Sequence, residues 1–141
     1  MTITDRSPVL SPVDLGDLAG AVTGVVLTPG QPGYAEESAP FNLALESSPA
    51  VVVGAANTAD VQAAVRFARE HDLPVAVMAT GHQASVPVDA AVLITTRRMS
   101  DVRIDPLLAT ATVGAGVSWQ QVVDAATPYG LAPLNLSLIH I

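Results

Sequence analysis

The chain has 141 residues, of which 50% are apolar and 13% charged, and its 6 basic and 13 acidic residues give a net charge of −7 at pH 7. This length allows one domain with its own hydrophobic core. Cysteine is absent, which excludes disulfides, thiolate metal sites and cysteine nucleophiles. The acidic balance argues against nucleic-acid binding, and no apolar run approaches the ~20 residues of a membrane span. Because the start of the chain lacks a signal-peptide pattern, we expect a cytoplasmic protein that binds neither nucleic acid nor membrane.

The N-terminal part opens with a helix-start pattern. Ser11 suits the cap and Pro12 the first turn, and the helix is predicted to run to about Ala19. A short apolar piece over residues 24–27 follows. The loop after it, up to Tyr34, is rich in glycine and proline and therefore in turns.

The middle of the chain predicts a strand–helix–strand unit. Residues 50–53 are rich in valine and read as a strand, and a helix is expected over residues 59–71. Its apolar face is predicted from the helical spacing of Val61, Ala64, Val65 and Ala68. Residues 75–78 are predicted to form the next strand, buried in the sheet. Such a unit implies a parallel pair of strands joined by a right-handed crossover.

The last third predicts a further buried strand, a hairpin and a helix. Residues 90–94 form an apolar run, and residues 102–104 and 110–113 flank an Asp105-Pro106 turn. Ser118-Trp-Gln-Gln121 matches a capping box, so a helix is expected to start there. Its predicted inner face is made by Trp119, Val122, Val123 and Ala126, and it ends at Pro128 and Gly130. The fold class predicted from these elements is α+β.

Two glycine-containing loops are the main candidate sites. The strand over residues 75–78 delivers the small residues of Thr80-Gly81 and then His82, which can hydrogen-bond, exchange a proton or form a covalent bond. Local sequence alone favours a loop histidine without a special role. Gly114-Ala-Gly116 lies between a strand and a helix, as a dinucleotide-binding turn does, but Trp119 occupies the third glycine position. A plain turn is therefore the better local interpretation of this second loop.

The carboxylates are scattered along the chain. Glu36 and Glu37 are adjacent in an expected loop, and Asp101 and Asp105 flank a hairpin strand, so solvated roles are predicted for all four. No His, Asp and Glu cluster has the spacing of metal ligands, and no metal site is expected.

The order of several weak motifs is more specific than any one of them. These are Phe41-Asn42, Ser48-Pro-Ala-Val-Val-Val53, Thr58-Ala-Asp-Val61, Leu73-Pro-Val-Ala-Val77, Thr80-Gly-His82, Arg98-Met99 and Val113-Gly-Ala-Gly-Val-Ser-Trp119. Taken in this order, they resemble the FAD-binding domain of the vanillyl-alcohol oxidase and p-cresol methylhydroxylase (PCMH-type) superfamily. The resemblance is strongest to the flavoproteins that are similar to the berberine bridge enzyme and to hydroxynicotine oxidase.

The resemblance implies a small parallel βαβ sheet with hairpin strands and flanking helices, forming part of a flavin-binding domain. It also implies FAD as the cofactor. In many relatives the histidine at the position of His82 is bonded to the 8α-methyl carbon of the flavin, so a covalent link through His82 is expected. The cofactor-binding residues that the resemblance implies are Ala79, Thr80, Gly81, His82 and Gln83 around the diphosphate, together with Gly114 and Gly116.

The sequence departs from the family pattern in two places. Met78 stands where relatives often carry arginine, four residues before the histidine. After Asn135 the family continues with a second glycine-rich flavin loop, whereas this chain reads Leu-Ser-Leu-Ile-His-Ile to its end. We therefore expect an N-terminal extension over residues 1–32, a partial FAD-binding domain over residues 33–135, and a tail over residues 136–141 that departs from the family. The catalytic residues and the substrate domain are expected in a longer parent protein.

The implied activity of that parent is FAD-dependent oxidation of a small organic molecule, with hydride transfer to the flavin and reoxidation by oxygen or another acceptor. The 141-residue segment alone is expected to have little activity, and its oligomeric state is left open. Two alternatives remain: an NAD(P)-binding enzyme, which the missing third glycine disfavours, and a non-catalytic α/β binding or interaction module.

Overall fold

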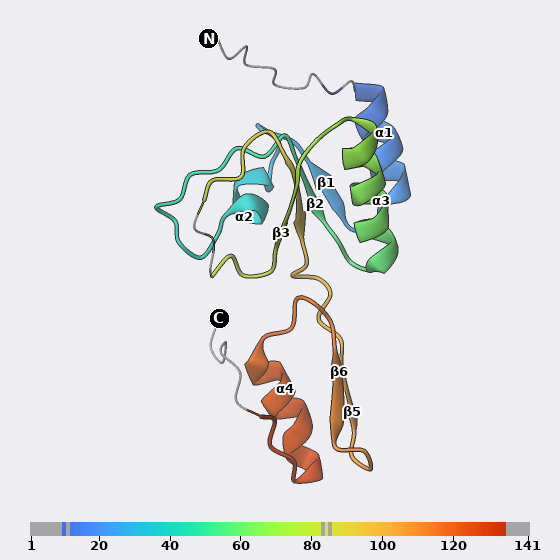
Figure 1. Cartoon of the computed structure of the whole chain (residues 1–141), viewed down its shortest axis with the longest axis vertical. Helices are drawn as coiled ribbons and strands as arrows, with labels where there is room; N and C mark the ends of the chain where they lie inside the picture. The colour runs from blue at the N-terminus through green and yellow to red at the C-terminus, as the bar shows by residue number, and fades with distance from the viewer. Residues whose placement is uncertain (1–9, 11, 83, 85, 135–141) are drawn as a thin grey trace.

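A computed structural model describes residues 10, 12–82, 84 and 86–134, and it has the predicted α+β class (Figure 1). Among the described residues, no helix has both the length and the apolar character of a membrane span. The elements are, in chain order, α1 (Pro12–Ala21), β1 (Val25–Leu27), α2 (Tyr34–Ser38), β2 (Val51–Gly54), α3 (Thr58–Glu70), β3 (Val75–Met78), β4 (Val92–Thr95), β5 (Val102–Asp105), β6 (Thr110–Val113) and α4 (Trp119–Ala126), followed by a 3-10 turn over Thr127–Tyr129.

The main sheet has the strand order β1-β2-β4-β3. β2 and β3 are each parallel to β4, whereas β1 runs antiparallel to β2. The predicted direct pairing of the strands on either side of α3 is therefore wrong, because β4 inserts between them. The physical reason is burial: all four residues of β4 are buried, and a strand with no polar face is most stable in the centre of a sheet.

The predicted strand over residues 75–78 is confirmed, but the prediction that it is buried is wrong. β3 is an edge strand, and its Val75 and Val77 side chains are 43% and 66% exposed. Both valines lie on the same face of the sheet as α1 and α3. These helices cover that face at β2 and β4 and leave it open at β3. A four-residue apolar run has the same pattern in a central and in an edge strand, so the sequence did not distinguish the two.

The hydrophobic core lies between the sheet and the two helices α1 and α3 (Figure 1). α3 buries Ala63, Ala64, Phe67 and Ala68 against the sheet, whereas Val65 is 46% exposed. The predicted apolar face is thus correct at Ala64 and Ala68 and wrong at Val65. The buried face is rotated because it is centred on Phe67, the largest apolar side chain of the helix. The sheet contributes Val51, Val53, Val92 and Ile94, and α1 contributes Leu18 and Val22.

The predicted hairpin and last helix form a second lobe that projects beyond the main sheet (Figure 1). β5 and β6 pair antiparallel, and α4 packs on β5 with Val122 and Ala126 buried. The predicted capping box is confirmed: the Gln121 side-chain oxygen accepts a hydrogen bond from the Ser118 backbone N–H at 2.8 Å. The lobe therefore has its own local packing, and residues 96–101 and 114–118 connect it to the sheet.

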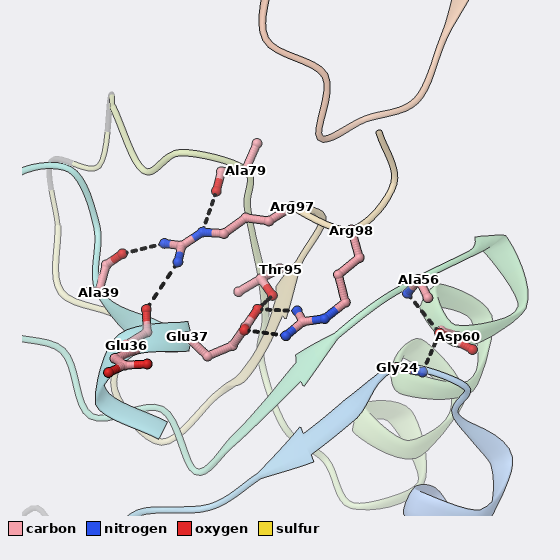
Figure 2. Close-up of polar contacts among 10 residues, drawn as sticks. All are labelled: Gly24, Glu36, Glu37, Ala39, Ala56, Asp60, Ala79, Thr95, Arg97 and Arg98. Carbon is pink, nitrogen blue, oxygen red and sulfur yellow. Dashed lines mark hydrogen bonds and ion pairs between the residues drawn. The ribbon is translucent and has the colours of Figure 1, made fainter. Parts of the chain in front are cut away.

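A buried aspartate fixes the start of α3 against the N-terminal part. Asp60 is 1% exposed, and its carboxylate accepts hydrogen bonds from the backbone N–H groups of Thr23 at 2.9 Å, Gly24 at 3.1 Å and Ala56 at 2.8 Å. Figure 2 shows the bonds from Gly24 and Ala56. Burial by itself raises the pKa of Asp60, but the hydrogen bonds from Thr23, Ala56 and Gly24 outweigh it and hold the pKa below its usual value. This carboxylate ties the α1–β1 connection to the β2–α3 connection.

Replacing Asp60 by asparagine removes the charge and one acceptor oxygen, so we expect a loss of about 2 kcal/mol in the free energy of unfolding at neutral pH. The loss should be measured by urea unfolding. Asp101→Asn is the matched control, because that side chain is exposed, and it should change stability by less than about 0.5 kcal/mol.

The lowered pKa also predicts a pH dependence. A carboxyl group whose pKa falls on folding stabilises the native state above the unfolded-state pKa of about 3.9, and this contribution is lost as the pH falls through the folded-state value. The stability difference between the wild type and Asp60→Asn should therefore shrink below about pH 4. A difference that stays constant into acid would contradict a charged Asp60.

Candidate functional site

The loop over residues 79–82 follows β3 and lies beside a pocket of about 490 Å³. The loop begins at the carboxyl end of an edge strand. In open parallel sheets, ligands commonly bind beside the carboxyl ends of the strands. The structure brings Ala79, Thr80, Gly81 and His82 together on this pocket, whereas Gln83 lies outside the described residues. The pocket is lined by residues 76–82 and by Ser38, Pro40, Leu45, Ser47, Ala84, Val86, Val88 and Leu93.

The carbonyl groups of residues 78–81, at the end of β3 and in the loop, accept hydrogen bonds from donors of the protein itself. The oxygens of Met78, Ala79, Thr80 and Gly81 accept hydrogen bonds, at 3.0, 3.2, 3.1 and 3.2 Å. The donors are the Thr96 N–H, the Arg97 Nε, the Phe41 N–H and the Ala84 N–H, in that order.

The backbone N–H groups of the same loop, those of residues 79–82, in contrast have no acceptor among the other described residues. Successive unpaired N–H groups in a turn form a concavity that suits an anion. The loop therefore has N–H donors available for a ligand, while three of its four carbonyl oxygens are bonded to the protein.

Gly81 is required at its position in the loop. Its φ of +70° lies in the left-handed region, and an added Cβ would come within 2.6 Å of the Pro40 Cα. Any other residue would be strained there and would push the loop away from the segment that contains Pro40.

The His82 side chain is exposed at the end of the loop. Its ring centroid lies 5.7 Å from that of Phe41, with the planes tilted by 52°. Phe41 also donates its backbone N–H to Thr80, so the same residue contacts both the loop and the imidazole. An imidazole placed in this way at the edge of the pocket can exchange a proton or react with a bound ligand.

Gly114 and Gly116 have a clear structural role. An added Cβ would lie 2.1 Å from the Met99 carbonyl oxygen at Gly114, and 2.0 Å from the Thr96 carbonyl oxygen at Gly116. Neither glycine lines the pocket beside the 79–82 loop. Both let the connection to the hairpin lobe pass close to residues 96–99, and their role toward a cofactor stays a prediction.

The prediction that Glu37 is a solvated carboxylate in a loop is wrong. It lies on α2, it is buried, and both of its oxygens accept hydrogen bonds from Arg98 at 2.8 Å, while Thr95 donates its hydroxyl to the same carboxylate (Figure 2). The Arg98 hydrogen bond lowers the pKa of Glu37, against the effect of burial and with help from Thr95. Glu37 in turn raises the pKa of Arg98. This paired charge joins α2 to the end of β4.

Arg97 was missed as a site residue by the sequence reasoning. Its guanidinium donates to three backbone carbonyls: Ala79 at 3.2 Å, Glu36 at 3.1 Å and Ala39 at 2.6 Å (Figure 2). The available signal was the pair of arginines directly after a buried strand, in a chain with 6 basic residues. Asp60 was missed as well, because its three partners lie in two connections outside α3, between α1 and β1 and between β2 and α3. Within the described part of the chain, no group of three or more acidic or histidine side chains is arranged to hold a metal ion.

Comparison with known proteins identifies this arrangement. Residues 49–140 match the family model described as FAD binding domain. The chain is 34% identical over 85 residues to a D-lactate dehydrogenase of Archaeoglobus fulgidus, covering 58% of this chain and 19% of the relative. It is 35% identical over 100 residues to an FAD-linked oxidoreductase of Bacillus subtilis, covering 68% of this chain and 22% of the relative. The chain thus spans about a fifth of the length of these relatives.

Solved structures show the same fold. The 6-hydroxy-D-nicotine oxidase of Arthrobacter nicotinovorans superposes with a TM-score of 0.70 and 23% identity, over 77% of this chain and 24% of that one. The carbohydrate oxidase of Microdochium nivale gives a TM-score of 0.70 and 22% identity, over 81% of this chain and 25% of that one. These likenesses confirm the predicted p-cresol methylhydroxylase-type fold. Because the family model matches well over half of the residues, the chain belongs to the FAD binding domain family.

Proposed function

We propose that the protein containing this chain is an FAD-dependent oxidoreductase that acts on a small organic molecule, and that the 79–82 loop holds the diphosphate of FAD. When bound, FAD supplies a ring that accepts a hydride at N5 and passes the electrons to oxygen or another acceptor. The observation that carries the proposal is the polarity of the loop: the carbonyls of Ala79, Thr80 and Gly81 accept hydrogen bonds from the protein, whereas the N–H groups of residues 79–82 donate none to the other described residues.

The residues present fit a cofactor with a diphosphate. Four consecutive N–H groups can donate to phosphate oxygens, and small side chains at Ala79 and Gly81 let an anion approach the backbone. The adjoining pocket of about 490 Å³ is lined mainly by aliphatic side chains, which suits an organic ligand better than a hydrated ion. Gln83 and the two glycines Gly114 and Gly116 are proposed as further cofactor-binding residues on the resemblance alone.

His82 is the proposed point of attachment if the flavin is covalently bound. Its ring is exposed at the pocket, and the loop that carries it is fixed by hydrogen bonds to Phe41 and Arg97. An imidazole nitrogen held in place is a suitable nucleophile for the electrophilic 8α-methyl carbon of a flavin. The residues of this chain therefore bind and orient the cofactor, whereas the groups that bind substrate and move its proton are proposed to lie elsewhere in the parent protein.

The relatives support the class of substrate. They include a D-lactate dehydrogenase, a 6-hydroxy-D-nicotine oxidase and a carbohydrate oxidase, each named for a small organic molecule. The alternatives of an NAD(P)-binding enzyme and of a non-catalytic module are not favoured, because the family match is to an FAD binding domain and the relatives are oxidoreductases. We also propose a cytoplasmic location.

The full-length protein should purify with a flavin absorbance band, or gain one when FAD is added to the colourless protein. The expected stoichiometry is about one flavin per chain, because the described residues contain one such loop. A full-length, folded protein that shows no band and binds no added FAD would contradict the proposed function.

Acid precipitation of the full-length protein tests the covalent link. We expect the flavin to remain with the wild-type precipitate and to be released almost completely from His82→Ala. His71→Ala is the matched control, since His71 follows α3 and packs on Phe67 with ring centroids 4.3 Å apart, and it should retain the flavin. Release from the wild type would show non-covalent binding, and retention by His82→Ala would move the attachment to another residue.

A further inference from the structure

The positive charges of this chain are few, and one of them lies beside the proposed cofactor loop. All 6 basic residues are arginines. Among those that the structure describes, Arg66 and Arg69 are exposed on α3, Arg103 is on the hairpin, and Arg98 is paired with Glu37. Arg97 is the arginine that contacts the 79–82 loop. In a chain with a net charge of −7, this guanidinium places a positive charge in direct contact with the loop.

The Arg97 guanidinium joins two separate segments of the chain. Its Nε donates to Ala79, at the start of the loop, and its two terminal nitrogens donate to the carbonyls of Glu36 and Ala39 (Figure 2). The rigid planar fork of arginine can hold three acceptors in this way, which the single ammonium of lysine matches poorly. Arg97 therefore fixes the carbonyl side of the loop against the segment around α2.

The charge of Arg97 is not neutralised by an ion pair. Its three partners are neutral carbonyls, and it has no salt bridge within the described ranges. The Glu37 carboxylate is already held by both terminal nitrogens of Arg98, and Arg97 is the weakest of the influences that lower the pKa of Glu37. A guanidinium has five N–H donors, and three are used here. The remaining charge and donors are free to act on a ligand.

We propose that Arg97 is a cofactor-positioning residue, which clamps the loop so that its N–H groups face the ligand and supplies the positive charge that favours a diphosphate there. The proposal rests on the proposed function. It differs from a purely structural clamp in one consequence: removal of Arg97 weakens the binding of a phosphate-bearing ligand more than that of a ligand without phosphate.

The test compares FAD with riboflavin, which has the same ring system but no phosphate. Both are titrated against full-length protein with His82→Ala, which keeps binding reversible, by flavin fluorescence. We expect Arg97→Gln to weaken FAD binding by about tenfold or more, the size of one favourable charge contact, and to change riboflavin binding by less than about twofold. Arg97→Lys keeps the charge without the fork and should fall between the wild type and Arg97→Gln.

Two controls separate charge from folding. Arg66→Gln removes the same charge from the outer side of α3 and should leave the affinity for FAD within about twofold. Added salt should weaken FAD binding more in the protein that has Arg97 than in Arg97→Gln. Only the protein with Arg97 has an attraction between guanidinium and diphosphate that salt can screen.

The outcomes distinguish this proposal from the proposed function. If the wild-type protein contains or takes up FAD but Arg97→Gln binds FAD equally tightly, the Arg97 proposal fails and the proposed function stands. Equal weakening of FAD and riboflavin, with no change in the salt dependence, would also overturn it, because it would show a structural clamp only. A wild-type protein that takes up no flavin contradicts the proposed function itself.

Discussion

The burial of β4 on both of its faces is the constraint on which the rest of the structure depends. Val92, Leu93, Ile94 and Thr95 are each at most 2% exposed, and they pair with β2 on one side and β3 on the other. Because all three strands are parallel, their carboxyl ends meet at one edge of the sheet. β3 delivers the 79–82 loop to this edge, and β4 delivers Arg97 and Arg98. This central, fully buried strand thus determines where the polar site residues meet.

Two buried carboxylates then fix the connections around that sheet. Asp60 collects three backbone N–H groups, and Glu37 is paired with Arg98 and bonded by Thr95. In both, burial opposes ionisation, and the donors more than compensate, so each pKa is lowered. Removing the donors would leave an uncompensated charge, whose cost exceeds what the contact contributes when intact. Buried carboxylates therefore fix the connections around the sheet at two places, the start of α3 and α2.

Much of this fold follows from local patterns. The valine-rich strand β2, the hairpin and the capping box at Ser118 could be predicted because each depends on residues close in sequence. The strand order could not, since an apolar run of four residues fits an edge as well as the centre of a sheet. Glu37 was assigned to solvent because its partners, Thr95 and Arg98, are 58 and 61 residues away. Contacts of that range depend on the topology, and local periodicity carries no information about them.

The 79–82 loop also combines features that are visible in the local sequence with features that depend on the topology. Its small residues and its histidine are visible in the sequence, but its polarity depends on donors from two other segments, one containing Phe41 and the other containing Thr96 and Arg97. A loop whose carbonyls and amides were equally free would attract an anion and a cation alike. Because the protein satisfies the carbonyl oxygens of Ala79, Thr80 and Gly81, the partial positive charges of the amides dominate, and the loop favours negative charge. Arg97 strengthens this preference for negative charge in two ways. It donates a hydrogen bond to the Ala79 carbonyl oxygen, and it adds a full positive charge beside the loop. The preference of the site for an anionic cofactor is therefore a property of the assembled sheet edge, in which the glycine-histidine motif is one part.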